Sequence, residues 1–289
     1  HFQLEKLFPE KTHKFMRYFI GDVRDKNRLD RAMIGVDMVI HAAAMKHVHI
    51  AEYNPDECIK TNVNGAMNVV ESCLKNKVKN IVALSTDKAC APINLYGATK
   101  LTSDKLFVAA NNFKGDKDTK FSVVRYGNVM GSNGSVIPFF LKKKSLNEVL
   151  PITHPDMTRF NISIEDGVKM IIFALKYSMG GEIFVPKIPS YKVTDLAQAI
   201  SPKSNTKIIG IRPGEKIHEE MITVSDSKNT YEIGNYYAII PTNPVFDFNE
   251  FVKFHSAKKV NDNFSYNSGS NSNFLSINQL SKLIKNLKI

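Results

Sequence analysis

Apolar positions in the first half of the chain follow two patterns that alternate. Continuous apolar runs, clearest at 37–44 (DMVIHAAA) and 80–85 (NIVALS), are typical of strands that are buried on both faces. Between these two runs, residues 56–76 repeat apolar side chains at helical spacing, so we expect a helix there. The same patterns predict further strands at 16–23 and 121–129 and further helices at 28–35, 95–112 and 165–178. This order predicts a doubly wound, Rossmann-like α/β fold, in which helices cover both faces of a parallel sheet.

The pattern loosens after about residue 130 into loops, short strands and short helices. We therefore expect a dinucleotide-binding domain over 1–130 and a smaller, mainly substrate-binding region over 131–289, with some segments returning to the sheet. Residues 261–274 (NDNFSYNSGSNSNF) predict a polar loop rich in serine and asparagine. The last segment, LSINQLSKLIKNL, begins with a serine cap and predicts a C-terminal helix.

Composition narrows the class of protein. The chain has 289 residues, 43% of them hydrophobic, and its longest apolar runs, such as MIIFAL at 170–175, fall far short of a membrane span. Three cysteines at irregular spacing, Cys58, Cys73 and Cys90, predict neither a disulfide framework nor a metal site, which favours a reducing cytoplasm. The net charge is +11, but the lysines are scattered and form no basic stripe among aromatic residues. We expect neither nucleic acid nor membrane as a partner, and any ligand that the charge favours is a small anion such as a nucleotide.

Residues 85–100 (STDKACAPINLYGATK) concentrate more ionisable groups than a strand-to-helix connection needs. Tyr96 and Lys100 are four positions apart on a predicted helix and share one face. A neighbouring ammonium and a nicotinamide cation would favour the phenolate, which makes Tyr96 a usable base toward a sugar hydroxyl. The alternative for this pair alone is a solvated helix face.

Position along the fold strengthens this interpretation. Residues 85–88 (STDK) follow the end of a predicted strand, where α/β enzymes place their catalytic groups. By themselves Asp87 and Lys88 could equally form an exposed turn. A serine or threonine at a strand end, a Tyr-x-x-x-Lys helix about ten residues later and the HAAA at 41–44 together resemble the short-chain dehydrogenase/reductase superfamily.

A glycine-rich phosphate loop is not found in residues 1–60. A dinucleotide fold needs a Gly-x-x-Gly-x-x-Gly turn after its first strand, so that backbone amides and a helix N-terminus can hold the pyrophosphate. Residues 21–25 (GDVRD) look like the end of the third strand. We therefore expect the first strand, first helix and second strand to lie upstream of His1, and the sequence to be a fragment in which the flanking strands lack a partner.

Longer motifs identify a closer resemblance. STDKACAPINLYGATKLTSDKLF, HAAAMKHVHIAEYNPDECIKTNVNGAMNV, RYGNVMGSNGSVIPFF and RPGEKIHEEM together resemble the inverting UDP-N-acetylglucosamine 4,6-dehydratases of pseudaminic acid and flagellin glycosylation pathways. The resemblance covers essentially the whole chain. Related sugar 4,6-dehydratases carry Asp-Glu after the threonine, the 4-epimerases lack this acidic pair, and membrane-anchored relatives replace the tyrosine with methionine.

The resemblance implies a catalytic set of Thr86, Asp87, Lys88, Tyr96 and Lys100 with NADP as cofactor. Tyr96, with its pKa lowered by Lys100, takes the C4 hydroxyl proton while hydride passes to NADP⁺, and Thr86 hydrogen-bonds the C4 oxygen. Neutral Lys88 removes the C5 hydrogen, and protonated Asp87 protonates the departing C6 hydroxyl. Hydride then returns to C6, and protonation of C5 from the opposite face inverts that centre. Burial is expected to bring the pKa values of this acid and base toward neutrality.

Further binding residues follow from the same resemblance. The cofactor-lining positions are Asp22, Val23, Ala42, Lys46, Tyr96 and Lys100, and the substrate contacts are Lys46, Asn128, Arg212 and Glu215. Arg212 and Glu215 would hold the UDP portion, although a Pro-Gly turn at the surface is the alternative for Arg212. Arg159 is an open candidate for a phosphate contact. His47 and His49 are expected to be loop or packing residues, and Asn133 stands where family members often have arginine.

Two other functions remain open at this stage. The first is a UDP-sugar 4-epimerase from the same superfamily. The second is a truncated non-catalytic protein that binds UDP-sugar or an intact partner subunit. The intact Asp87, Lys88, Tyr96 and Lys100 oppose the second alternative, and the absent phosphate loop supports it. A homo-oligomer is expected from the relatives, whereas the choice of NADP or NAD is normally set at the end of the second strand.

Overall fold

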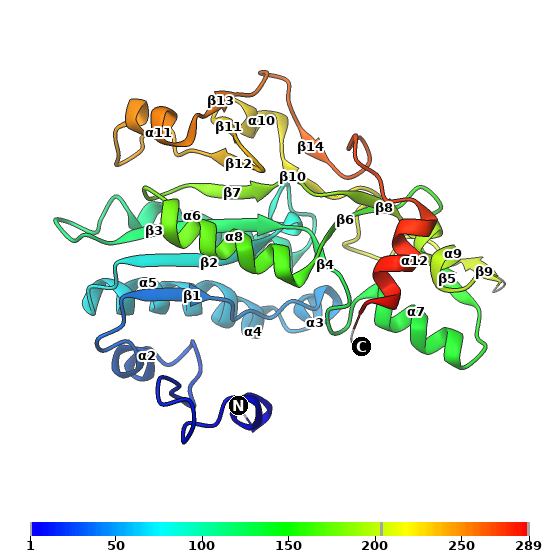
Figure 1. Ribbon diagram of the computed structural model, residues 1–289, viewed down its shortest axis with the longest axis horizontal. Coiled ribbons are helices and arrows are strands. Elements are labelled where there is room, and N and C mark those ends of the chain that lie inside the picture. Colours follow the sequence, from blue (N-terminus) through cyan, green and yellow to red (C-terminus); the bar gives the residue numbers. More distant parts are fainter. Residues whose placement is uncertain (1, 203–204, 288–289) are drawn as a thin grey trace.

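A seven-stranded sheet forms the centre of the computed structural model, which describes residues 2–202 and 205–287 (Figure 1). Its strands lie in the order β1-β2-β3-β7-β12-β11-β13. The first four are parallel to their neighbours, and the last three pair antiparallel. Their bounds are β1 Met38–His41, β2 Asn80–Thr86, β3 Lys120–Tyr126, β7 Ile183–Pro186, β11 Thr230–Ile233, β12 Tyr236–Ile239 and β13 Lys258–Lys259. The predicted Rossmann-like α/β fold is confirmed, and its sheet is mixed, parallel over β1, β2, β3 and β7 and antiparallel beyond β7.

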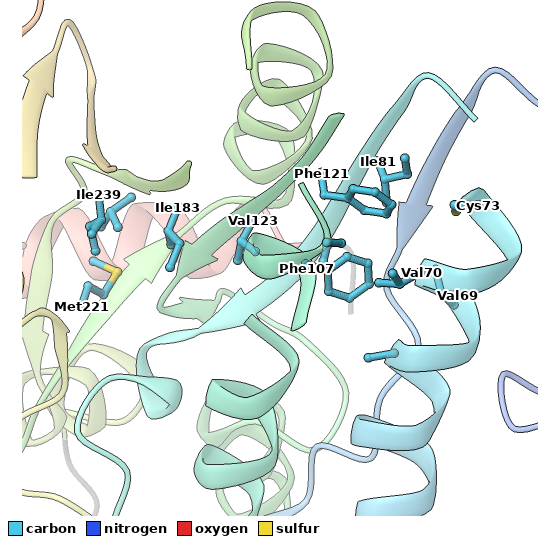
Figure 2. Close-up of a cluster of buried hydrophobic side chains, with 14 of the residues drawn as sticks. Val69, Val70, Cys73, Ile81, Phe107, Phe121, Val123, Ile183, Met221 and Ile239 are labelled. Atoms are coloured by element: carbon cyan, nitrogen blue, oxygen red, sulfur yellow. The ribbon is translucent and has the colours of Figure 1, made fainter. Parts of the chain in front are cut away.

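Helices cover both faces of this sheet. Successive residues of a strand point to opposite faces, so each strand contributes side chains to both helix layers. Ile81 of β2 and Val123 of β3 contact the cluster that contains Phe107, on the side of α5 and α6 (Figure 2). The alternate residues of these strands, such as Val82, point to the opposite face, where they belong to a second cluster with Met170 of α8 and with residues of α11. Burying one such aromatic or aliphatic side chain contributes about 1.5–3 kcal/mol. The covering helices are α2 Lys26–Ala32, α5 Gly65–Lys75, α6 Leu95–Ala110, α8 Ile164–Tyr177 and α11 Phe248–His255.

The helix expected over 56–76 forms in three continuous parts. It consists of α4 (Pro55–Ile59), a π-helical turn (Lys60–Asn64) and α5. Within the π turn, the Asn62 amide accepts from Met45 N at 2.8 Å and donates to Met45 O at 3.0 Å. The widened turn therefore ties the loop that follows β1 to the helix layer, next to α3 (Val48–Tyr53).

Beyond the sheet, a third apolar cluster forms among α7, β5, α9 and α12, and Figure 1 shows α12 beside α9. Small sheets join segments that are distant in sequence: β4-β6-β8, β5-β9 and β10-β14. The remaining bounds are α1 Phe2–Leu7, β4 Asn128–Val129, α7 Val136–Ser145, β5 Leu150–Ile152, β6 Thr158–Ile162, β8 Ser190–Lys192, α9 Val193–Ile200, β9 Thr206–Ile208, β10 Glu220–Ile222, α10 Val224–Ser227, β14 Tyr266–Asn267 and α12 Ile277–Lys285. Residues after 130 thus supply β7, β11, β12 and β13 to the main sheet, and the domain boundary near residue 130 stays a prediction.

Local predictions have mixed outcomes. The C-terminal helix is confirmed, with Ser276 and Gln279 forming a reciprocal capping box. The predicted polar loop at 261–274 contains the short strand β14. The strand expected at 16–23 is wrong, since residues 16–22 have no regular structure and Ile20 is 82% exposed. An apolar run becomes a strand only when a neighbouring strand pairs with its backbone. Among the described residues, no helix combines the length and apolar character that crossing a bilayer requires.

Candidate active site

The carboxyl end of β2 leads into a short 3₁₀ turn, Asp87–Ala89, that carries the first predicted catalytic residues. The Thr86 hydroxyl caps this turn by accepting from Lys88 N at 3.3 Å, and it donates to Asp87 Oδ1 at 2.9 Å. Asp87 is only 1% exposed. The strand end and its cap therefore fix an acid and a lysine side by side, as the sequence predicts.

Helix α6 places Tyr96 and Lys100 against that turn. Asn94 caps the helix by accepting from Gly97 N at 2.7 Å. Gly97 allows the close approach, because a Cβ at this position would lie 2.2 Å from the Lys88 carbonyl oxygen. Both side chains are buried, and Lys100 Nζ donates to the Leu84 carbonyl of β2 at 2.6 Å. The structure thus brings Thr86, Asp87, Lys88 and Tyr96 together, and it places Lys100 four residues farther along α6, bonded to the strand that ends in Thr86.

Lys88 is the centre of a buried ion cluster that includes two residues from the second half of the chain. Its Nζ lies 3.1 Å from Asp87 Oδ1 and 3.1 Å from Glu219 Oε1. Arg159 Nε is 3.9 Å from the same Glu219 oxygen. Arg159, for which the sequence left a phosphate contact open, is 9% exposed and lies next to a carboxylate.

Glu219 is a member of this cluster that the sequence did not indicate. It lies within RPGEKIHEEM, but two adjacent glutamates at the start of a short strand carry no spacing signal. Its proximity to Lys88 arises only from the fold.

The environment changes the acid–base behaviour of this cluster. Burial raises the pKa of Asp87 above its ordinary value, against the opposing effect of Lys88. Burial by itself lowers the pKa of Lys88, but the carboxylates of Asp87 and Glu219 outweigh it and leave that pKa raised. The expectation is confirmed in direction for Asp87 and wrong for Lys88, which is held as an ammonium.

The pKa of Tyr96 also departs from the expectation. Burial raises it to about 12, and the nearby Lys88 ammonium opposes this only in part. Lys100, whose own pKa burial lowers, directs its ammonium toward Leu84 O. The expected lowering of the Tyr96 pKa by Lys100 is therefore wrong for the protein alone, because desolvation of the phenolate is the larger effect.

Several buried oxygen atoms in and around the cluster have no hydrogen-bond partner among the described residues. They are Asp87 Oδ2, Asn128 Oδ1, Glu215 Oε2 and Glu219 Oε2. A buried acceptor without a partner costs about 1–3 kcal/mol. Gly127 packs closely beside one of them, since a Cβ there would lie 2.4 Å from Phe160 Cβ and 3.4 Å from Asp87 Oδ2. These acceptors indicate where a hydroxylated ligand could donate hydrogen bonds.

Three of the predicted substrate residues, Lys46, Arg212 and Glu215, lie on loops, and the fourth, Asn128, begins β4. Lys46 Nζ donates to the Asn133 carbonyl at 2.9 Å, which joins the loop after β1 to the loop before α7. Arg212 Nη2 pairs with Glu215 Oε1 at 2.8 Å, and the Arg212 side chain is 67% exposed. Lys216 Nζ donates to the Cys90 carbonyl at 2.7 Å. The 212–216 loop is thereby anchored to the segment between Lys88 and α6.

The remaining residues that the sequence predicts to line the cofactor are Asp22, Val23 and Ala42. Asp22 forms an exposed ion pair with Arg24 at 2.7 Å, and Arg24 also reaches Glu57. Val23 is half-buried and lies where a Cβ on Gly65 would come within 2.8 Å of its side chain. Ala42 follows β1 directly and is exposed. Asp22 thus belongs to an ion-pair cluster separate from that of Lys88.

Comparison with known proteins agrees with the geometry. A family model described as polysaccharide biosynthesis protein matches residues 2–241. A UDP-N-acetylglucosamine 4,6-dehydratase (inverting) from Campylobacter jejuni subsp. jejuni serotype O:2 is 59% identical over 276 residues, covering 93% of this chain and 82% of the relative.

Solved structures show the same fold. The X-ray structure of Pen from Bacillus thuringiensis has a TM-score of 0.88 and 35% identity, covering 99% of this chain and 86% of that one. A double mutant of DesIV, a dTDP-glucose 4,6-dehydratase from Streptomyces venezuelae with NAD and DAU bound, has a TM-score of 0.66 and 22% identity over 74% of this chain and 73% of that one. The latter likeness shows the Rossmann-like fold alone.

Proposed function

The chain belongs to the polysaccharide biosynthesis protein family, and from this membership we propose that it is a C5-inverting UDP-N-acetylglucosamine 4,6-dehydratase. The observation that carries the proposal is the meeting of a buried carboxyl, an ammonium and a phenol, those of Asp87, Lys88 and Tyr96, at the end of β2. The reaction removes one water from C5 and C6 of the sugar. Its product is a UDP-2-acetamido-2,6-dideoxy-4-keto-hexose.

A nicotinamide cofactor, for which we propose NADP, would supply hydride-transfer chemistry at C4 and C6 of the sugar. The residues proposed to hold it are Tyr96, Lys100, Asp22, Val23, Ala42 and Lys46. The donor set near the catalytic turn fits such a group. Lys100 is a buried ammonium with three donors, of which Leu84 O accepts one, and the Tyr96 phenol lies on the same helix face.

Oxidation at C4 requires a base for the hydroxyl proton, and Tyr96 is proposed for this role. With its pKa raised to about 12 by burial, Tyr96 needs positive charge near its hydroxyl before it can act at neutral pH. Lys88 already acts in that direction, and the oxidised nicotinamide would add to it. Thr86 is proposed to hydrogen-bond the C4 oxygen.

Elimination requires a base at C5 and an acid at C6, which we assign to Lys88 and Asp87. Moving one proton across the 3.1 Å between Lys88 Nζ and Asp87 Oδ1 converts the ion pair into an amine and a carboxylic acid. The amine then removes the C5 proton, the C5–H electrons form the C5–C6 double bond, and the C6–O bond breaks as Asp87 protonates the leaving hydroxyl. The raised pKa of Asp87 favours this neutral form, whereas the raised pKa of Lys88 opposes it, so the ion pair is the resting state and the neutral pair forms during the reaction.

Substrate binding is proposed for Lys46, Asn128, Arg212 and Glu215. The unpartnered oxygens of Asn128 and Glu215 support contacts to hydroxyl or amide donors, and the exposed Arg212 guanidinium suits a phosphate. We further propose that the enzyme is a cytoplasmic homo-oligomer whose product serves pseudaminic acid synthesis and flagellin glycosylation. These proposals rest on the resemblance of the motifs.

The test is a proton NMR time course with UDP-N-acetylglucosamine and NADP⁺ in D₂O, repeated with NAD⁺. We expect a new C6 methyl signal, a 4-keto product and deuterium at an inverted C5. Asp87→Asn should lower kcat by about 10²–10⁴-fold, since it removes the proposed acid, whereas Asp118→Asn on an exposed loop should not. Appearance of a C4 epimer without a methyl signal would favour an epimerase. Binding of UDP-sugar without turnover by the wild type would favour a non-catalytic protein.

A further inference from the structure

Glu219 is a buried carboxylate that no step of the proposed mechanism uses. Glu219 is 2% exposed, and its Oε1 lies 3.1 Å from Lys88 Nζ. Its Oε2 is buried without a hydrogen-bond partner among the described residues. A buried charge is costly unless a charge of opposite sign lies beside it. For the Glu219 carboxylate that charge is the Lys88 ammonium.

The backbone of Glu219 is held from the far end of the chain. Glu219 N donates to Ser268 Oγ at 2.9 Å, and Ser268 N donates to Glu219 O at 2.8 Å. Thr158, which precedes Arg159, bonds the same serine hydroxyl at 2.7 Å. The backbone that carries this carboxylate is thus held by hydrogen bonds from β6 and from the segment after β14, and the carboxylate itself is held at Lys88 by the ion pair.

We propose that Glu219 is a positioning residue that holds Lys88 Nζ beside Asp87 and supplies the negative charge that the ammonium needs once it has taken the C5 proton. The inference rests on the proposed dehydratase function. When Lys88 takes that proton and Asp87 gives its own to the leaving hydroxyl, the pair returns to ammonium and carboxylate. Glu219 stabilises this ammonium without itself gaining or losing a proton.

The pH dependence of kcat reports this role. The active pair of Lys88 and Asp87 carries one proton, so activity falls when the pair gains a second proton at low pH or loses its only one at high pH. A nearby negative charge makes both protons bind more tightly. It therefore moves both half-points, the two pH values at which kcat is half of its maximum, to higher pH. The charged and titratable groups that face Lys88 and Glu219 are Asp87, Tyr96, Arg159, Tyr191 and Lys216.

The variants are Glu219→Gln, which keeps the shape and removes the charge, and Glu219→Asp, which keeps the charge. Glu220→Gln is the matched control, because Glu220 is only partly buried and the charges that act on it are Lys216 and Asp226 rather than Lys88. For Glu219→Gln we expect kcat to fall by about tenfold or more with KM within about twofold, and both half-points to move down by about one pH unit. Glu219→Asp should keep the wild-type half-points, and Glu220→Gln should match wild type throughout. A lower kcat with unmoved half-points in Glu219→Gln would overturn the proposal, since a purely structural role predicts that result.

A readout without turnover separates this inference from the proposed function. The lysine ¹⁵Nζ signal that disappears in Lys88→Met identifies Lys88 and can be titrated in the absence of substrate. We expect the pKa of Lys88 to fall by about one unit or more in Glu219→Gln. An unchanged titration would refute the role of Glu219 even in an active enzyme. A wild type that makes no keto sugar would refute the proposed function while leaving the titration interpretable.

Discussion

Replacing Gly97 with alanine tests whether the contact between α6 and the Asp87–Lys88 turn sets the catalytic geometry. A Cβ on Gly97 would lie 2.2 Å from the Lys88 carbonyl oxygen and 3.0 Å from Pro92 Cβ. Ordinary non-bonded contacts need about 3.5 Å, so the turn and the helix must separate by roughly 1 Å. The obstructing atoms at Lys88 belong to the backbone and cannot rotate away.

The magnitude follows from two opposing effects. Overpacking a buried site costs typically about 1–3 kcal/mol. Alanine regains about 0.5–1 kcal/mol of helix propensity over glycine. We therefore expect a net destabilisation of about 1–2 kcal/mol for Gly97→Ala. Because the shift separates Tyr96 from Lys88, kcat should fall by up to about 10²-fold.

The matched control is Gly167→Ala in α8, where a Cβ would meet nothing within 4 Å. This variant should gain about 0.5–1 kcal/mol and keep full activity. Urea unfolding measures the stability of both variants, and the NMR assay measures kcat. A Gly97→Ala protein with wild-type stability and kcat would refute the reasoning. Lost stability with an unchanged kcat would show that the contact supports the fold but does not position Tyr96.

Three further predictions concern stability. Burial and then the Lys100 charge lower the pKa of His41 to about 4, so its contribution to stability is complete above pH 6.5 and is lost as pH falls toward 4. Between pH 7 and pH 5 this loss amounts to about 2 kcal/mol, and His41→Leu should remove it, measured as urea midpoints at the two pH values. Asp104→Asn leaves the buried Arg125 without its charge partner and should cost about 3–5 kcal/mol, and a cost below 1 kcal/mol would contradict this. Ser276→Ala removes one half of the capping box of α12 and should cost about 0.5–2 kcal/mol in thermal or urea unfolding, unless the helix is held by packing alone.

The elements that could be predicted from sequence are those specified by neighbouring residues. The apolar run at 80–85 became β2 because its side chains alternate between two buried clusters, and Ser276 began α12 by bonding the backbone three residues later. The run at 16–23 also holds several residues that favour strands and yet formed none, since strand formation depends on a partner that composition does not reveal. The catalytic stretch was predictable for the same local reason, because a strand end and one helix turn carry all five of its residues.

The sequence by itself determined the parallel sheet, the strand-end location of Asp87 and Lys88, and the shared face of Tyr96 and Lys100. Only the tertiary structure decided which charges meet there. Glu219 and Arg159 reach Lys88 from segments far along the chain, and no periodicity or spacing links them to it. Ionisation was decided in the same way, since the pKa of Asp87, Lys88 or Tyr96 depends on burial and on every charge within a few ångströms. Local sequence specifies backbone geometry, whereas electrostatics at the site is a sum over neighbours that only folding brings together.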